Sequence, residues 1–379
     1  MALDAKTKAL IQGGVDVVNL TAGEPDFDTP VFIRQAAADA MNRGETRYTP
    51  VGGTVRLKSA IQDRLKMDTG IEYGADQVLV SVGAKHSLYN AIFALTNPGD
   101  GVLLPVPFWV TYPEQIRLAG GEVQLVEIDP SHKGELRVED LEKVVRPNTK
   151  GIILNSPSNP SGAVIGRARL AAIAEFAVDR NLWVISDEIY ARLVYDGMEA
   201  VSIASMPGMG ERTVVINGVS KAYAMTGWRI GYAAGPRHVI QAMANLQSQC
   251  TSNPSSISQA AAEAALTGPQ EPVEEMRREF DRRRRYAVSR IQDMPGLRVN
   301  EPKGAFYLWV DMSQLLGRTI GGRVVNNADD LALLWLEDAR VSVVPGSGFG
   351  VNDHFRMSYA TSMERLAEGL DRMERLLGE

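Results

Sequence analysis

Short apolar runs alternate with longer amphipathic segments between residues 76 and 235. Short runs bounded by turn residues are typical of buried strands, and longer segments with a period of about 3.6 residues are typical of helices. The short runs predict strands at 77–82, 101–104, 122–128, 151–154, 182–185, 213–216 and 230–234. The longer segments predict helices at 85–96, 109–119 and 167–180. This alternation indicates α/β units around a mostly parallel, buried sheet.

The pattern changes after residue 255 and predicts a separate small α+β domain. Helices are expected at 256–266, 271–292 and 362–377, and strands at 305–310, 341–344 and 355–359. The highly charged segment 271–292 is the expected connector. Its run Arg282–Arg285 resembles a nucleic-acid patch, but acidic residues stand beside it, so a solvated helix is the favoured interpretation.

Composition excludes several classes of protein. The 379 residues are 45% hydrophobic, 23% charged and carry a net charge of -6, which excludes extensive disorder and gives no global reason to bind nucleic acid. The single cysteine, Cys250, excludes a disulfide framework, and with four histidines no metal cluster is expected. Neither a membrane-spanning run nor a signal peptide is visible, so the cytoplasm is the expected location.

Two reactive side chains follow predicted strands. Asp187 follows the apolar run 182–185, at the carboxyl end of that predicted strand, and Lys221 lies just past the run 213–216. Open α/β sheets bind ligands at the carboxyl ends of their strands. A lysine among apolar neighbours has a lowered pKa, which frees its amine as a nucleophile. Alone, Asp187 could equally be a helix cap and Lys221 a surface residue.

Three further polar groups follow other predicted strands. The turn Ser81–His86 opens a helix and could bind an anion, Asn159 stands in a turn-rich tract, and Arg229 could neutralise a phosphate. Each is weak evidence by itself. A lysine, a carboxylate and phosphate donors together match the requirements of pyridoxal 5'-phosphate.

The chain resembles the fold-type I pyridoxal-phosphate aminotransferases of class I/II, most closely the bacterial-type aspartate aminotransferases of subgroup Iγ. The resemblance runs nearly end to end. The motifs that carry it are Leu20–Phe27, Tyr48-Thr49-Pro50, Gly83-Ala84-Lys85, Phe108-Trp109, Asn159-Pro160-Ser161-Gly162, Ser186–Tyr190, Ser220-Lys221, Gly227-Trp228-Arg229 and Phe355–Ala360.

This resemblance implies an α/β fold of the aspartate-aminotransferase type. A large cofactor-binding domain, residues 29–285, would hold a mixed, mostly parallel seven-stranded sheet between helices. A small α+β domain would combine residues 1–28 with residues 286–379.

The same resemblance implies how the cofactor is held. Lys221 would form the internal aldimine and move the proton between substrate Cα and cofactor C4′. Asp187 would keep the pyridinium nitrogen protonated, Asn159 and Tyr190 would bind the phenolic oxygen, and Trp109 would stack on the ring.

Phosphate and substrate contacts also follow from the resemblance. The backbone of Ala84 and Lys85, the Arg229 side chain and Tyr48 of a second subunit would bind the phosphate, so a homodimer with shared sites is implied. The substrate α-carboxylate would be bound by Arg356, assisted by Asn159 and the Gly23 backbone.

Two positions depart from the pattern of many relatives. Gly218 stands where a phosphate-binding serine is common, so another group must replace that contact. Ser161 stands where threonine is usual, and the hydroxyl is retained.

The implied reaction is ping-pong transfer of the amino group from L-aspartate to 2-oxoglutarate. The arginine that reads the aspartate side chain in the vertebrate-type branch is absent, because its position is Ser248, and Lys85 is the favoured replacement. Lys85 could instead serve the phosphate alone. Prephenate or aromatic transamination, C–S β-lyase chemistry and a cofactor-binding regulator are the alternatives. Relatives that use prephenate carry an arginine near the N-terminus, where this chain is expected to be short by one segment.

Overall fold

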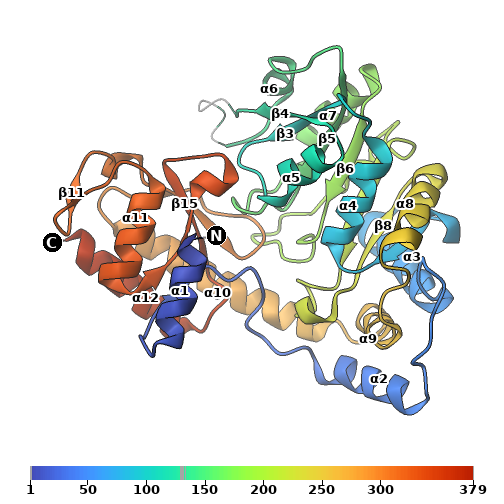
Figure 1. Ribbon diagram of the computed structural model, residues 1–379, viewed down its shortest axis with the longest axis horizontal. Helices are drawn as coiled ribbons and strands as arrows, with labels where there is room; N and C mark the ends of the chain where they lie inside the picture. The colour runs from blue at the N-terminus through green and yellow to red at the C-terminus, as the bar shows by residue number, and fades with distance from the viewer. Residues whose placement is uncertain (1, 129–131, 133, 379) are drawn as a thin grey trace.

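The computed structural model describes residues 2–128, 132 and 134–378 and shows two layered regions joined by one long helix (Figure 1). That helix, α10 (Glu271–Asp293), runs from beside α9 in this view toward the C-terminal elements. The first helix, α1 (Ala2–Gln12), lies beside those C-terminal elements rather than with the segments that follow it in sequence. Chain segments from both ends therefore build one of the two regions.

The larger region is organised around a seven-stranded sheet. Its strands, in spatial order, are β2 (Val78–Ser81), β8 (Gly231–Ala234), β7 (Thr213–Gly218), β6 (Trp183–Asp187), β5 (Thr149–Asn155), β3 (Gly101–Pro105) and β4 (Glu122–Val126). Strand β8 is antiparallel to both neighbours, and the other pairings are parallel. The prediction of a mixed, mostly parallel seven-stranded sheet is confirmed, and each strand overlaps the apolar run that predicted it.

Successive residues of the central strands bury opposite faces of the sheet. Ile185 of β6 packs with α4 (Ala84–Leu95), α5 (Thr111–Leu118) and α8 (Arg237–Cys250). Its neighbour Val184 packs with α6 (Val138–Glu142) and α7 (Arg167–Asp179). Because both faces are covered, the strands are continuously apolar, which is why they are readable as short unbroken runs.

A third helical layer covers the edge near β2. It contains α2 (Val31–Asn42), α3 (Val55–Thr69) and α9 (Ser256–Thr267), and α2 packs along α9. Helices α2, α3 and α8 lie outside the segments predicted from periodicity, whereas α4, α5, α7 and α9 confirm the predicted helices. The remaining helical segments are short: η1 (Ala75–Gln77), η3 (Ile203–Ser205), η4 (Thr226–Trp228), η5 (Ser313–Leu315), η6 (Trp335–Ala339) and η7 (Gly346–Phe349).

The smaller region is an antiparallel sheet covered by helices. Its strands, in order, are β14 (Val344–Pro345), β15 (His354–Ser358), β10 (Tyr307–Asp311) and β9 (Arg298–Val299). Helices α11 (Ala328–Leu334) and α12 (Met363–Leu377) pack on it. Strand β1 (Val18–Asn19) pairs in parallel with β13 (Val341–Ser342), and β11 (Thr319–Ile320) pairs with β12 (Arg323–Val324). The domain boundaries after residues 28 and 285 stay a prediction, and α10 is continuous through residue 285.

The arginine run of α10 is not the solvated face that was predicted. Arg282 and Arg285 are exposed, but Arg283 and Arg284 are buried. Arg284 forms ion pairs with Asp196, Asp281 and Glu301. Four consecutive helical residues spread over most of the helix circumference, so they cannot all face water when one side packs.

No helix among the described residues is both long and apolar enough to cross a membrane.

Candidate active site

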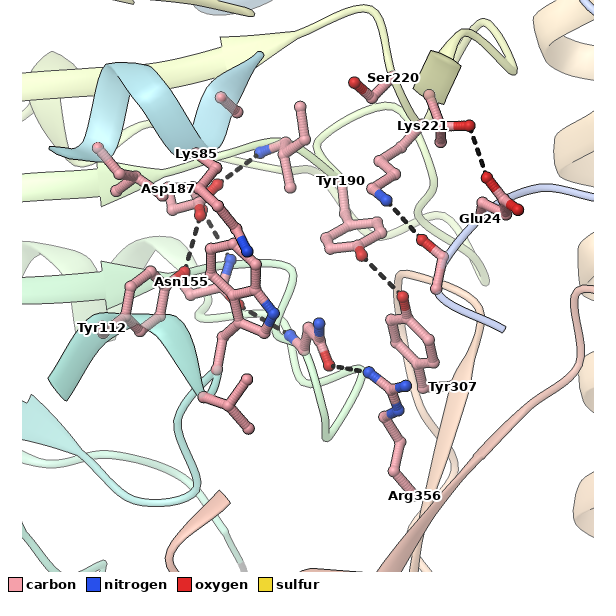
Figure 2. Close-up of a pocket in the computed structure, with 18 of the residues that line it drawn as sticks. Glu24, Lys85, Tyr112, Asn155, Asp187, Tyr190, Ser220, Lys221, Tyr307 and Arg356 are labelled. Carbon is pink, nitrogen blue, oxygen red and sulfur yellow. Dashed lines mark hydrogen bonds between the residues drawn. The ribbon is translucent and has the colours of Figure 1, made fainter. Parts of the chain in front are cut away.

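A cavity of about 540 Å3 lies where the carboxyl ends of the parallel strands meet the smaller region. Strands β5, β6 and β7 end at this edge, and the antiparallel β8 begins there. The cavity is lined by ten of the eleven predicted site residues: Gly23, Ala84, Lys85, Trp109, Asn159, Asp187, Tyr190, Lys221, Arg229 and Arg356. Residues remote in sequence are therefore brought to one site (Figure 2).

Asp187, the last residue of β6, is a buried carboxylate with two hydrogen-bond donors. Tyr112 donates its hydroxyl to Oδ2 at 2.7 Å, and the Ile189 N–H donates to Oδ1 at 3.2 Å (Figure 2). Burial raises the pKa of Asp187 to about 6, and the hydroxyl of Tyr112 opposes this shift. A cation placed against the carboxylate would relieve the cost of burying its charge.

Lys221 lies three residues past the end of β7, and its amine points into the cavity. Its Nζ donates to the Gly23 carbonyl oxygen at 2.5 Å and lies 5.9 Å from the centre of the Tyr190 ring. Burial lowers the pKa of Lys221 to about 8, although nearby Glu24 opposes the shift. The predicted lowering of this pKa agrees with the structure, and a substantial fraction of the amine is neutral near physiological pH.

A ready anion site lies at the start of α4. The N–H groups of Ala84 and Lys85 have no acceptor within the helix because they belong to its first turn. Gly83 precedes them with φ of 81°, and a Cβ there would overlap the guanidinium of Arg229. The Arg229 side chain therefore lies against the turn that presents these donors.

The missing serine at position 218 has a structural reason. A Cβ on Gly218 would lie 2.9 Å from the Ile230 carbonyl oxygen and 3.0 Å from the Gly231 Cα. Strands β7 and β8 thus approach too closely here for a side chain. Ser220, buried at the rim of the same cavity, is the nearest hydroxyl on this segment.

Arg356 is a buried guanidinium without a carboxylate partner among the described residues. It projects from β15, is 8% exposed, and donates to the Asn159 Oδ1 and the Thr21 carbonyl oxygen, each at 2.9 Å. Its Nε is buried without a hydrogen-bond partner. A buried, incompletely satisfied guanidinium is chemically suited to bind a carboxylate.

Lys85 is a second cation without an ion pair in the described part of the chain. Its Nζ lies 4.8 Å from the centre of the Trp109 ring. Partial burial and the charge of Arg229 lower the pKa of Lys85. Besides Lys221 and Arg229, which lies against the anion turn, the cavity thus offers two further cationic side chains, Lys85 from α4 and Arg356 from β15, that form no ion pair with an acidic residue in the described part of the chain.

Tyr48 is the one predicted site residue that the single chain leaves outside this cavity. Its side chain is 92% exposed and lines a separate depression between Gly44 and Glu263.

Two tyrosines of the site were not predicted from the sequence. Tyr112 donates to Asp187, and the Tyr307 hydroxyl lies 2.9 Å from that of Tyr190 (Figure 2). Tyr112 follows Trp109 by three residues, a spacing that could have placed it on the same helix face. Tyr307 also stacks under Arg356, 4.4 Å from ring centre to guanidinium carbon, and nothing in its local sequence signals this contact.

Comparison with known proteins identifies the family. The family model for aminotransferase class I and II matches residues 15–373. An aspartate aminotransferase of Bacillus sp. (strain YM-2) is 45% identical over 378 residues, which are 100% of this chain and 95% of that protein. An aspartate/prephenate aminotransferase of Cereibacter sphaeroides is 45% identical over 377 residues, covering 99% of this chain and 94% of that protein.

Solved structures agree with this assignment. The crystal structure of the aspartate aminotransferase from Rhizobium meliloti superposes with a TM-score of 0.96 at 44% identity, covering 100% of this chain and 95% of that one. This confirms the fold predicted from the motifs. The chain belongs to the class I and II aminotransferase family and is an enzyme of that family.

Proposed function

We propose that this enzyme transfers the amino group of L-aspartate to 2-oxoglutarate, giving oxaloacetate and L-glutamate, with pyridoxal 5'-phosphate as cofactor. Full-length relatives named aspartate aminotransferase at about 45% identity support the reaction. The observation that carries the substrate class is that, once Lys221 and Arg229 are assigned to the cofactor, two more cations without an ion pair among the described residues, Lys85 and Arg356, line the same cavity.

The residues of the cavity fit the proposed cofactor. Asp187 is a buried carboxylate that forms no ion pair with a cation among the described residues, and a protonated ring nitrogen would supply one. The Ala84 and Lys85 N–H groups and the Arg229 side chain would together bind the phosphate. Glycines stand at positions 83, 218 and 231 around this turn, where a Cβ would overlap neighbouring atoms. Lys221 supplies an amine for covalent attachment, and Trp109, Asn159 and Tyr190 line the space between.

Lys221 and Asp187 would then each control the position of one proton, on the substrate Cα and on the ring nitrogen respectively. When bound, pyridoxal phosphate withdraws electrons from the Cα of an attached amino acid and so makes its proton acidic. Lys221, with a pKa of about 8, can take and return that proton at its Nζ. Asp187 would hold a proton on the ring nitrogen, because separation of that pair would leave a buried carboxylate alone.

The substrate would be held by its two carboxylates. Arg356 would bind the α-carboxylate through its guanidinium, which Asn159 and the Tyr307 ring already orient. Lys85, above the Trp109 ring, would bind the side-chain carboxylate. Aspartate, glutamate and 2-oxoglutarate all carry the two anionic groups that this arrangement requires.

Prephenate is the second candidate substrate. It too is a dicarboxylate, and a relative named aspartate/prephenate aminotransferase is 45% identical to this chain. Arg356 and Lys85 could bind its two carboxylates in the same way.

A homodimer with shared sites completes the proposal. Tyr48 is almost fully exposed on one chain, and Val31 and Val55, at the starts of α2 and α3, are exposed apolar residues of the same helical layer. Exposed apolar side chains gathered on one layer favour a subunit contact. Tyr48 would contact the phosphate bound in the partner subunit, so the active enzyme would be a dimer.

Lys85→Ser tests the substrate assignment. A hydrogen bond to a charged group is worth about 1.5–3 kcal/mol, so kcat/KM for aspartate should fall about 10- to 100-fold. Alanine and phenylalanine, which lack the second carboxylate, serve as internal controls and should lose less than about threefold by the same reasoning. An equal loss for all three amino acids would show that Lys85 serves the phosphate alone.

A further inference from the structure

Two fully buried glutamines lie outside the cavity and have no role in the proposed chemistry. Gln247 of α8 and Gln259 of α9 each have 0% exposure. Burying an amide is unfavourable unless its donors and acceptor are all bonded. Both amides are bonded to the same short segment, Tyr48–Thr54, which we call the arm.

Gln259 holds both ends of the arm. Its Nε2 donates to the Thr49 Oγ1 at 3.0 Å and to the Pro254 carbonyl oxygen at 2.9 Å. Its Oε1 accepts from the Thr54 N–H at 2.8 Å. Thr49 adjoins Tyr48, so this one side chain fixes the base from which the exposed tyrosine projects.

Gln247 joins the middle of the arm to strand β2. Its Nε2 donates to the Val51 and Val80 carbonyl oxygens, both at 2.8 Å. Its Oε1 accepts from the Ser81 hydroxyl at 2.7 Å and from the Asn90 amide at 3.1 Å. Every hydrogen-bonding position of this amide is used, and two partners belong to the strand that leads into the anion turn.

The backbone of the arm also packs directly on β2. The Val80 N–H donates to the Gly52 carbonyl oxygen at 3.0 Å. Gly53 has φ of 102°, and a Cβ there would lie 2.5 Å from the Val80 Cγ2. The arm is therefore fixed against the same strand end that precedes Gly83, Ala84 and Lys85.

We propose that Gln259 and Gln247 are positioning residues that hold the arm so that Tyr48 reaches the phosphate bound by the partner subunit. This rests on the proposed shared-site dimer. Because Gln247 bonds the arm and the end of β2 together, the anion turn of one site and the tyrosine serving the other site form one hydrogen-bonded unit.

A double-mutant cycle on cofactor affinity tests this inference. The dissociation constant of pyridoxal 5'-phosphate is measured by equilibrium dialysis of the holoenzyme, with sedimentation checking that each variant remains a dimer. Tyr48→Phe should raise the constant about tenfold through loss of a charge-assisted hydrogen bond. Gln259→Leu should raise it about three- to tenfold in the parent, but less than about twofold in the Tyr48→Phe background.

Matched variants distinguish a specific effect on the position of Tyr48 from a general loss of folding stability. Gln124 is also buried and hydrogen-bonded, but lies on β4 at the opposite sheet edge. Gln124→Leu should lower the melting temperature and leave cofactor affinity unchanged. Thr49→Val removes the hydroxyl that accepts from Gln259 and donates to the Pro50 carbonyl oxygen, and should weaken affinity in the same coupled manner, whereas Thr49→Ser retains the hydroxyl and should keep the parent value. This pair decides the question even if Gln259→Leu does not fold.

The outcomes distinguish this inference from its premise. If Gln259→Leu and Thr49→Val weakened binding equally with and without Tyr48, or left the parent affinity unchanged, the positioning role would be overturned. If Tyr48→Phe itself kept the parent affinity, the shared phosphate contact of the proposed function would be wrong.

Discussion

Burial sets the ionisation of three side chains at the end of the central strands. The pKa of Asp187 is raised to about 6, that of Glu188 is raised to about 7, and that of Lys221 is lowered to about 8, with desolvation the largest cause in each case. Asp187 and Lys221 face the cavity, whereas Glu188 accepts hydrogen bonds from Ser186 and Ser202 and does not line it.

The lowered pKa of Lys221 predicts pH-dependent reactivity. In cofactor-free enzyme, competitive acetylation followed by mass spectrometry should give half-maximal reactivity of Lys221 near pH 8, because only the neutral amine is a nucleophile. Lys66 is the control, since Glu72 raises its pKa and should keep it unreactive in that range. Identical pH profiles for the two lysines would contradict this description of the site.

The raised pKa of Glu188 predicts that the folded protein loses stability as the pH rises. Its folded-state pKa of about 7 lies above the ordinary glutamate value of 4.5, so its contribution is most favourable below the lower value and is lost as pH rises through about 7. The ionised form should cost up to about 3 kcal/mol. Glu188→Gln should therefore raise the melting temperature of cofactor-free enzyme more at about pH 8 than at about pH 5. A gain independent of pH would contradict burial as the cause.

Some residues of the cavity are recognisable from sequence because they lie near a strand end. Asp187 lies two residues past the apolar run 182–185 and Lys221 five residues past the run 213–216, and the structure places both in the cavity. Tyr112 and Tyr307 were missed because their roles depend on tertiary packing. Tyr112 reaches Asp187 from a helix on one sheet face, and Tyr307 arrives from the smaller region.

At the scale of elements, α10 shows that a charged run can be buried and can form ion pairs that hold the fold together. It joins the two regions, and its buried side includes apolar residues together with Arg283 and Arg284. Arg283 bonds to Asp26 and Glu279, which ties the helix to the N-terminal segment. Charge counts along the sequence predicted a solvated helix, but only helix phase and packing determine which arginines are buried.

Arg284 and Arg285 form a matched pair for testing this assignment. The Arg284 side chain is 0% exposed and that of Arg285 is 63% exposed. Arg284→Met should reduce unfolding free energy by about 3 kcal/mol, because it leaves partly buried acids without their cation. Arg285→Met should change it by less than about 0.5 kcal/mol. Urea unfolding monitored by circular dichroism measures both, and equal losses would contradict the burial assignment.

At the scale of the whole molecule, local periodicity predicted the strands but not how they are assembled. The order β2-β8-β7-β6-β5-β3-β4 and the reversal of β8 depend on contacts between distant segments. Parallel pairing of β1 with β13 brings residue 18 beside residue 341, which no local pattern encodes. The aspartate-aminotransferase type of fold was expected from the motifs that carry the family resemblance. The periodicity alone supported only the α/β class.

The same assembly brings side chains from both regions into one cavity. The larger region supplies Lys85, Asp187, Lys221 and Arg229, and the smaller region supplies Arg356 and Tyr307. The proposed substrate contacts therefore come from both regions, whereas the proposed cofactor contacts within the chain come from the larger one.

The most direct test of the central claim is a single-turnover measurement of the two half-reactions. Reconstituted enzyme is mixed with aspartate and no acceptor, and then with 2-oxoglutarate after the free amino acid is removed. We expect one oxaloacetate released per active site in the first step and one glutamate formed per site in the second, as a ping-pong mechanism requires. No oxaloacetate from aspartate, or continued oxo-acid release without an acceptor, would contradict it.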